Sequence, residues 1–323
     1  MSFQSVYMTQ VYSGFEPSQA FDVVYGGRFE HRLLSSRQTV LQHQRLILGD
    51  IRLETGCYDF PVIAQGCMPE DGICIGFMAV GGDRTKVNTT SLGADEIQIY
   101  PASLELLYHA FGPSRWVNFF VPEAVLQLQA TRRLGFTLAL PTQSAQSLHL
   151  TAGGRHALTC LADDAFDVAR RVQPGGGLAP ELAAVIRESL LNGYIDALGS
   201  ATPSREAARS VVERRHHHLI SACERLVLSG EDADVAMTEI ARRSGYSLRS
   251  LELIFRRSVG MTPGRWFMTA RLNGALRDLL TDGQSSVSEV ATKWGFRHMS
   301  RFAQYFRQAF GESPRETLRR VRS

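Results

Sequence analysis

The sequence of 323 residues has no long hydrophobic run. Its longest nearly apolar stretch, residues 72–82, covers about eleven positions, whereas a membrane-spanning helix needs about 20. The first ten residues, MSFQSVYMTQ, contain neither a basic cluster nor an apolar run, so we expect no secretory signal there. We therefore expect a cytoplasmic protein that does not contact the membrane.

Cysteine is also scarce. The chain has five cysteines, an odd number, and none of them forms a C-x-x-C pair. A disulfide framework is therefore not expected, and a reducing compartment is. Cys57, Cys67 and Cys74 could ligate a metal or sense oxidation, but we expect them to be buried as small apolar side chains.

Catalytic and metal-binding motifs are missing as well. The chain contains no G-x-S-x-G, H-E-x-x-H or G-x-x-x-x-G-K-[ST]. The consecutive histidines 216–218 point about 100° apart on a helix and cannot converge on one ion, so we expect a solvated or DNA-facing surface. His31, His43 and His109 do not supply the two histidines and one carboxylate of a metal-dependent oxygenase. We expect no enzyme activity, no metal and no cofactor.

Charge is unevenly distributed along the chain. Residues 206–323 hold 20 Lys and Arg against 13 Asp and Glu, a net +7, while residues 1–205 hold 15 against 19, a net −4. All but one of the 20 cations are Arg, which forms forked hydrogen bonds to phosphate and to guanine. The basic part therefore predicts a polyanionic partner.

A repeated pattern occupies this basic part. Residues 239–263 read EIARRSGYSLRSLELIFRRSVGMTP, and residues 289–314 read EVATKWGFRHMSRFAQYFRQAFGESP. In both copies a glycine, Gly245 or Gly295, stands where the chain must turn with positive φ. An aromatic residue follows, and then two large apolar residues four positions apart, which is the spacing of one helix face.

Helix, glycine turn and helix together predict two helix-turn-helix units, at 236–257 and 286–308. Residues 266–280 between them carry a helical apolar stripe about 22 Å long. A connector of that length can hold two reading helices about one DNA turn apart, roughly 34 Å, on one face of a duplex.

Residues 211–322 resemble the DNA-binding domain of the AraC/XylS family of transcription regulators. The matching pieces are E-I-A-x-x-S-G-Y-S, F-x-x-x-x-G-M-T-P, the Arg271-Leu272 pair, V-A-x-x-x-G-F and F-x-x-x-F-x-x-x-F-G-x-S-P. The resemblance implies binding to double-stranded DNA, activation of transcription with RNA polymerase as partner, a small-molecule effector and a possible homodimer.

The resemblance also implies which side chains contact DNA. The base-reading positions become Arg249, Glu252 and Leu253 in the first unit, and His298, Met299, Ser300 and Gln304 in the second. Phosphate contacts are expected from Arg256, Arg257, Arg301 and Arg307. Chemically, Arg249 suits guanine and Glu252 suits the cytosine amino group. Leu253 suits either a thymine methyl group or a partner protein.

The first two hundred residues predict short strands separated by turn signals. The expected strands are 44–56, 61–65, 73–80, 96–100, 104–111 and 115–121. They indicate a β-sandwich or small barrel, and the resemblance implies a cupin-like sensor. As an effector pocket we take six aromatic residues, which could equally fill a core: Tyr58, Phe77, Tyr100, Tyr108, Trp116 and Phe119.

Helices are expected at 123–133 and 155–172, with a linker in the glycine run 173–177. An amphipathic helix at 179–198 either packs on its own domain or, by resemblance, forms a dimer. The resulting domains are 1–173 (β-rich sensor), 174–205 (linker or dimerisation helix) and 206–323 (DNA binding). The fold class is α+β with an all-α C-terminal domain.

We thus expect a sequence-specific regulator of transcription, an activator that responds to an effector bound by the N-terminal domain. One alternative is a ligand-independent regulator whose N-terminal domain only dimerises or contacts a partner. The other, from a different class, is a β-barrel enzyme fused to a DNA-binding module.

Overall fold

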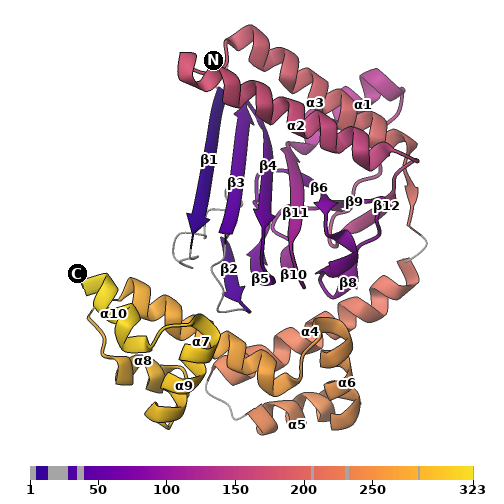
Figure 1. Ribbon diagram of the computed structural model, residues 1–323. Helices are drawn as coiled ribbons and strands as arrows, with labels where there is room; N and C mark the ends of the chain where they lie inside the picture. Colours follow the sequence, from indigo (N-terminus) through magenta and orange to yellow (C-terminus); the bar gives the residue numbers. More distant parts are fainter. Residues whose placement is uncertain are drawn as a thin grey trace.

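A computed structural model describes residues 5–13, 28–34, 40–204, 207–229, 233–282 and 284–322. They form an N-terminal β-rich part with three helices and a C-terminal all-helical part, as the sequence predicted (Figure 1).

Two antiparallel sheets build the N-terminal part, and we call them together the barrel. The larger sheet has the order β1-β3-β4-β11-β6-β9-β12-β13, and the smaller has the order β2-β5-β10-β7-β8. The strands of the larger sheet are β1 (Ser5–Ser13), β3 (Val40–Leu48), β4 (Ile51–Tyr58), β6 (Ile73–Val80), β9 (Glu96–Tyr100), β11 (Ser114–Val121), β12 (Gln146–His149) and β13 (Thr202–Pro203). Those of the smaller sheet are β2 (Arg28–Leu33), β5 (Val62–Cys67), β7 (Thr85–Val87), β8 (Thr90–Ser91) and β10 (Glu105–Ala110).

Sequence reasoning found most of these strands but merged two of them. The segment expected as one strand, 44–56, contains parts of both β3 and β4, which pair as a hairpin around Gly49-Asp50. Gly49 has φ 65, the left-handed conformation that glycine adopts without strain. The N-terminal strands β1 and β2 were missed, because their sequences mix polar and charged residues with apolar ones. The strands β7, β8, β12 and β13 were missed as well, since each has only two to four residues.

Three helices cover one face of the larger sheet: α1 (Glu123–Leu134), α2 (Gly154–Val172) and α3 (Pro180–Ser200). Strand β11 shows how the two faces differ. Its Val117 and Phe119 belong to the core under these helices, and Phe119 stacks on Tyr194 of α3 with ring centroids 4.3 Å apart. Trp116 and Phe120 point to the other face, into the barrel.

The glycine run joins α2 to α3 through a short 3₁₀ turn, η3 (Gln173–Gly175). Both helices pack in the same core as the larger sheet, so α3 belongs by its packing to the N-terminal part. Two residues of the expected apolar stripe, Leu182 and Val185, are exposed on α3.

The C-terminal part, which we call the helical domain, consists of seven helices within the described residues. They are α4 (Ala207–Leu228), α5 (Ala233–Ser244), α6 (Leu248–Val259), α7 (Pro263–Thr281), α8 (Val287–Lys293), α9 (Met299–Phe310) and α10 (Pro314–Arg322). The helical domain lies beneath the barrel, against the smaller sheet (Figure 1). Helix α7 is the expected connector and begins three residues earlier than predicted. Among the described helices, none has the length and apolar character needed to cross a bilayer.

Two glycines of α7 allow a matched test of its packing. A Cβ at Gly274 would overlap the Trp294 ring, whereas a Cβ at Gly264 meets nothing within 4 Å. We expect Gly274→Ala to lower the free energy of unfolding by about 1–3 kcal/mol through overpacking. Gly264→Ala should raise it by about 0.4–1 kcal/mol, because the unfolded chain loses freedom. Urea denaturation of both variants measures the difference, and equal effects would contradict the packing described here.

Candidate nucleic-acid interface and ligand cavity

The first helix-turn-helix unit is made of α5 and α6. Gly245, with φ 74, makes the turn between them. The Ser247 side chain caps α6 by accepting a hydrogen bond from the Ser250 backbone N–H at 3.1 Å. Leu251 and Phe255 are fully buried on the inner side of α6. The unit spans 233–259 and so begins before the expected residue 236, which is buried inside α5.

The second unit repeats this construction with α8 and α9. Ser286 and Glu289 form the predicted capping box at the start of α8, and Gly295 turns the chain with φ 78. Phe302 and Phe306 are fully buried on the inner side of α9. The second helix of each unit, α6 or α9, is its recognition helix. Because each recognition helix buries one face in its own core, its opposite face is left exposed.

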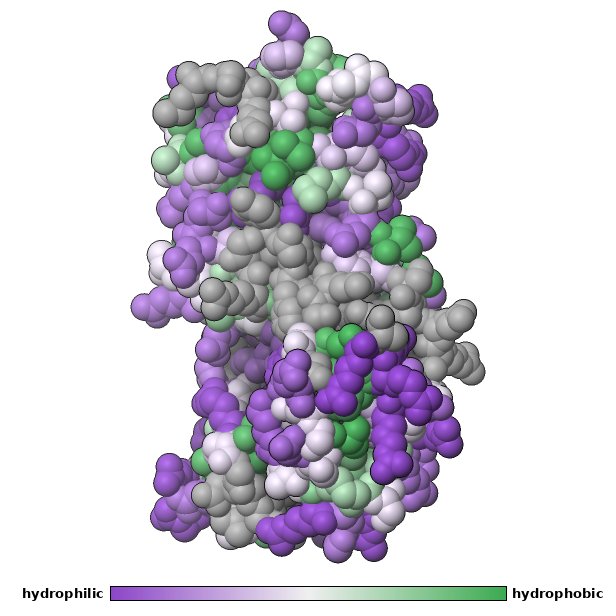
Figure 2. All heavy atoms as spheres, turned by 90° about the vertical axis from the view of Figure 1, so that its left-hand side faces the viewer, coloured by the Kyte–Doolittle hydropathy of each residue, from purple (hydrophilic) through white to green (hydrophobic). Residues whose placement is uncertain are grey.

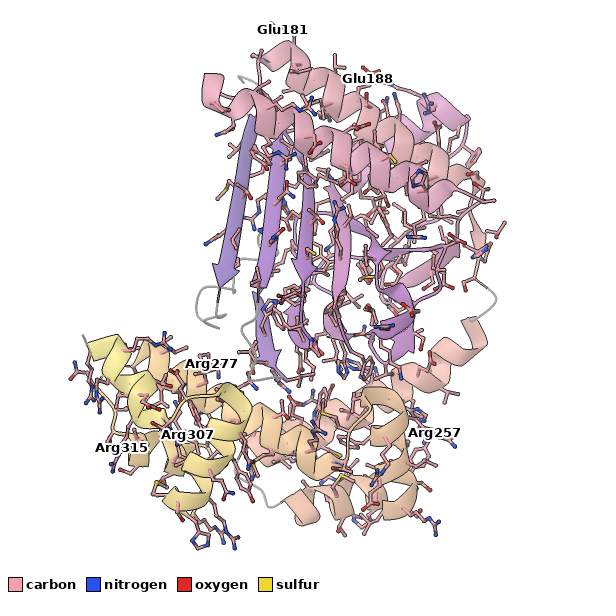
Figure 3. All side chains as sticks on the ribbon, in the orientation of Figure 1. Glu181, Glu188, Arg257, Arg277, Arg307 and Arg315 are labelled. Carbon is pink, nitrogen blue, oxygen red and sulfur yellow. The ribbon has the colours of Figure 1, made fainter. Side chains whose placement is uncertain are left out.

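All predicted DNA contacts are on these exposed faces. The exposed residues are Arg249, Glu252, Leu253, Arg256 and Arg257 on α6, and His298, Met299, Ser300, Arg301, Gln304 and Arg307 at the start of α9 and along it. Figure 2 shows hydrophilic side chains gathered over the lower half of one side of the molecule, where α8, α9 and α10 lie. In Figure 3, Arg257 and Arg307 lie toward opposite ends of the helical domain.

Several of these cations have no ion-pair partner within the described part of the chain. Among the described residues, no carboxylate lies within 4 Å of the guanidinium groups of Arg249, Arg256 or Arg301. Arg307 differs, because it lies 3.7 Å from the Glu316 carboxylate. An exposed guanidinium without a carboxylate retains its donors for phosphate or base oxygens.

A cleft beside the second unit was not predicted from the sequence. It has a volume of about 880 Å³ and lies between the end of α4, the middle of α7 and the turn before α9. Its lining includes four basic side chains, Arg271, Lys293, Arg297 and Arg301, and the imidazole of His298. Arg297 stands two residues after the turn glycine, a position from which the sequence could have suggested contact with DNA.

The start of α9 lacks the usual N-cap. His298 occupies the N-cap position, and its side chain makes no capping hydrogen bond. Ser, Thr, Asp and Asn are the residues that stabilise this position. An exposed histidine at an N-cap position, where its side chain makes no capping hydrogen bond, is the kind of local exception found at functional sites.

A cavity of about 60 Å³ lies inside the barrel, between the two sheets. Five of the six aromatic residues expected in an effector pocket line it: Tyr58, Phe77, Tyr100, Tyr108 and Trp116. Phe119 does not line it, because the alternation along β11 directs Phe119 to the opposite face, against Tyr194. Sequence reasoning missed Phe29, His31, Gln98 and Asn118 as lining residues.

The cavity interior is uncharged. Burial lowers the pKa of His31 to about 4, so its ring is neutral at pH 7. The His31 Nε2 atom lies 2.9 Å from the Tyr58 hydroxyl, and burial raises the pKa of that hydroxyl. The Tyr108 hydroxyl pairs with Ser114 Oγ at 2.9 Å.

Two other expectations need correction. His217 is buried, and burial lowers its pKa to about 4, so this ring is not part of a solvated surface. Cys57 and Cys67 are exposed, and only Cys74 of the three N-terminal cysteines is buried as expected. The residues that the structure describes contain no cluster of three His, Cys, Asp or Glu suited to a metal ion.

Comparison with known proteins assigns the helical domain to a family of helix-turn-helix domains. Residues 209–320 match the family described as "Helix-turn-helix domain". The probable thc operon regulatory protein of Rhodococcus erythropolis is 43% identical over 89 residues, which are 27% of each chain. The transcriptional activator NphR of Rhodococcus sp is 26% identical over 308 residues, 93% of this chain and 81% of that one.

The XylDLEGF operon transcriptional activator 2 of Pseudomonas putida is 32% identical over 125 residues, 36% of this chain and 79% of that one. The family model thus covers the part with the doubled helix-turn-helix, and the similarity to NphR extends over most of the chain. This chain belongs to the AraC/XylS family of transcription regulators.

Proposed function

We propose that this protein is a sequence-specific activator that binds two successive major grooves of one DNA duplex and responds to a small molecule in its barrel. The observation that carries the proposal is the pair of recognition helices, α6 and α9, each with one buried face and one exposed polar face. Helix α7, of 19 residues and thus about 28 Å long, connects them.

The base-reading residues divide by their chemistry. Arg249 would donate two hydrogen bonds to guanine, and Glu252 would accept one from the cytosine amino group. Leu253 is exposed and suits a thymine methyl group. On α9, His298, Met299, Ser300 and Gln304 would face the second groove. Arg256, Arg257, Arg301 and Arg307 would contact phosphates, and so would Arg297 of the cleft.

The alternatives are supported less well. A largely apolar cavity with a few polar groups is typical of a ligand site, so it favours a sensor over an N-terminal part that only dimerises or contacts a partner. The enzyme alternative lacks a metal-binding triad among the described residues. RNA polymerase as a partner, action in the cytoplasm and a homodimer belong to the proposal, the homodimer with exposed Leu182 and Val185 of α3 as its surface.

Two arginine variants separate base reading from phosphate binding. Arg249→Ala should cost about 1–3 kcal/mol of binding free energy at one base pair and relax specificity there. Arg301→Ala should weaken binding to all sequences alike and reduce the salt dependence by about one phosphate contact. Gel-shift titrations on a panel of operator variants at several salt concentrations measure both effects. If both variants lost affinity equally on every sequence, the assigned roles would be incorrect.

A histidine variant separates stability from function. His298→Ser supplies the missing cap of α9 and should raise the free energy of unfolding by about 0.5–1 kcal/mol. The same variant should weaken specific DNA binding, because the imidazole no longer faces the groove. Ser247→Ala is the reverse case and should destabilise the first unit by about 1 kcal/mol. A His298→Ser protein that is more stable and binds DNA as tightly as the wild type would remove His298 from the interface.

A further inference from the structure

We propose that Trp294 is a positioning residue, whose seat on α7 fixes the second recognition helix relative to the first and so sets the spacing of the two DNA half-sites. The seat is formed by Gly274, Arg277 and Asp278, and a half-site is the stretch of duplex read by one unit. The inference rests on the proposed function, because a spacing has meaning only for a protein whose two units bind one duplex.

The first unit is attached to α7 by a short link. Only three residues, 260–262, separate the end of α6 from the start of α7. Three residues span at most about 10 Å, so the end of α6 stays against the start of α7. Phe255 of α6 and Phe267 of α7 also pack edge to face, with ring centroids 5.6 Å apart. The first recognition helix is therefore fixed to the connector.

The second unit has a longer link and depends on other contacts for its orientation. Five residues, 282–286, separate α7 from α8. Apolar side chains of α7, among them Leu276 and Leu279, share one core with Phe302 and Phe306 of α9. The hydrophobic effect that drives this packing is non-directional. A defined angle of α9 therefore requires directional contacts as well.

Trp294 supplies two such contacts. It is the C-cap residue of α8 and directly precedes Gly295, the turn of the second unit. Its ring lies so close over Gly274 of α7 that a Cβ at this glycine would overlap three ring atoms. Its indole N–H donates a hydrogen bond to Asp278 Oδ2 at 2.8 Å. Close packing and a hydrogen bond together fix both the distance and the direction of the ring.

A cation holds the same ring from another side. The Arg277 guanidinium lies over the Trp294 ring, 5.7 Å from its centroid, in a cation–π contact. Arg277 also pairs with Glu30 of β2 at 3.2 Å, and in Figure 3 it lies where the helical domain meets the barrel. The cation is therefore itself held between the ring and a carboxylate.

The turn that follows Trp294 packs on the same face of α7. A Cβ at Gly295 would lie 3.4 Å from the guanidinium carbon of Arg271. Arg271 also donates to the Val227 carbonyl, near the end of α4, at 3.4 Å. Arg271, Gly274 and Asp278 are spaced i, i+3 and i+7, so they share one side of the helix. Since α9 begins four residues beyond the turn glycine, this side of α7 directs the recognition helix.

The internal repeat shows how the two units differ at this position. The first unit reads S-G-Y at 244–246, and the second reads W-G-F at 294–296. Ser244, the counterpart of Trp294, donates from its hydroxyl to the Ala241 carbonyl of its own helix at 3.3 Å. The large, rigid side chain thus stands in the unit with the longer link.

A fixed angle has a consequence for DNA binding. Each base pair inserted between the half-sites moves the second one about 3.4 Å along the duplex and about 35° around it. A firmly held α9 cannot follow and loses base contacts, each of which contributes about 5- to 150-fold to discrimination. The wild-type protein should therefore prefer one spacing over its neighbours by about 10-fold or more.

Spacing preference is measured with duplexes that the full-length wild-type protein selects from a random library. Derived duplexes lengthen or shorten the selected spacing by one base pair, or scramble one half-site. Asp278→Ala removes the acceptor of the indole N–H, and Trp294→Leu empties the seat. Both variants should show a preference below about 3-fold, because a loosely held α9 follows the moved half-site, and both should bind the selected spacing less tightly.

Ser244→Ala is the matched control, since it truncates the equivalent position of the first unit and should keep the wild-type preference. On duplexes with one intact half-site, all variants should bind as the wild type does. An undiminished spacing preference in both seat variants would overturn the proposal, because the apolar core alone would then set the angle. So would an equal loss of affinity on every duplex, since that is the mark of a general folding defect.

A measurement without DNA separates this proposal from the proposed function. Spin labels on unnatural amino acids at the exposed positions 253 of α6 and 304 of α9 report the distance between the recognition helices. Pulsed electron paramagnetic resonance should give a narrow distance distribution for the wild type and for Ser244→Ala, and a broad one for Asp278→Ala and Trp294→Leu. Equal widths in all four proteins would refute the positioning role. Wild-type binding that ignored the second half-site would refute the two-groove function alone.

Discussion

The alternation of side chains along the smaller sheet is the constraint on which the two parts of this protein depend. One face of the sheet closes the cavity, and the other face carries the docking surface of the helical domain. Since successive residues of a strand face opposite sides, His31 and Arg32 are covalent neighbours with separate environments.

A buried ion pair between Arg32 of β2 and Glu224 of α4, whose side chains are 3% and 6% exposed, makes this contact specific. Burial would lower the pKa of Arg32, but the adjacent Glu224 carboxylate raises it above its ordinary value, so the guanidinium stays charged. Apolar surface alone would allow the helical domain to slide on the sheet. A bidentate pair with the Trp266 N–H as third partner fixes one register instead.

The helical domain itself obeys a simpler rule. Each unit buries two large apolar residues from one face of its recognition helix and turns at a glycine with positive φ. Polar and basic side chains then occupy the free face by default. Gly274 lets Trp294 pack closely against α7, which places the second unit against the connector.

The sequence by itself determined the helical domain, because its signals are local. Glycine turns, the S-x-x-E capping box and apolar residues at helical spacing act within a few positions, and the motif is present twice. It also identified five cavity aromatics, since apolar strands must bury them somewhere. Only the tertiary structure decided that Phe119 faces α3 rather than the cavity, and that Arg32 meets Glu224 across 192 positions of chain. Strand register and domain docking join residues far apart in sequence, so no local pattern specifies them.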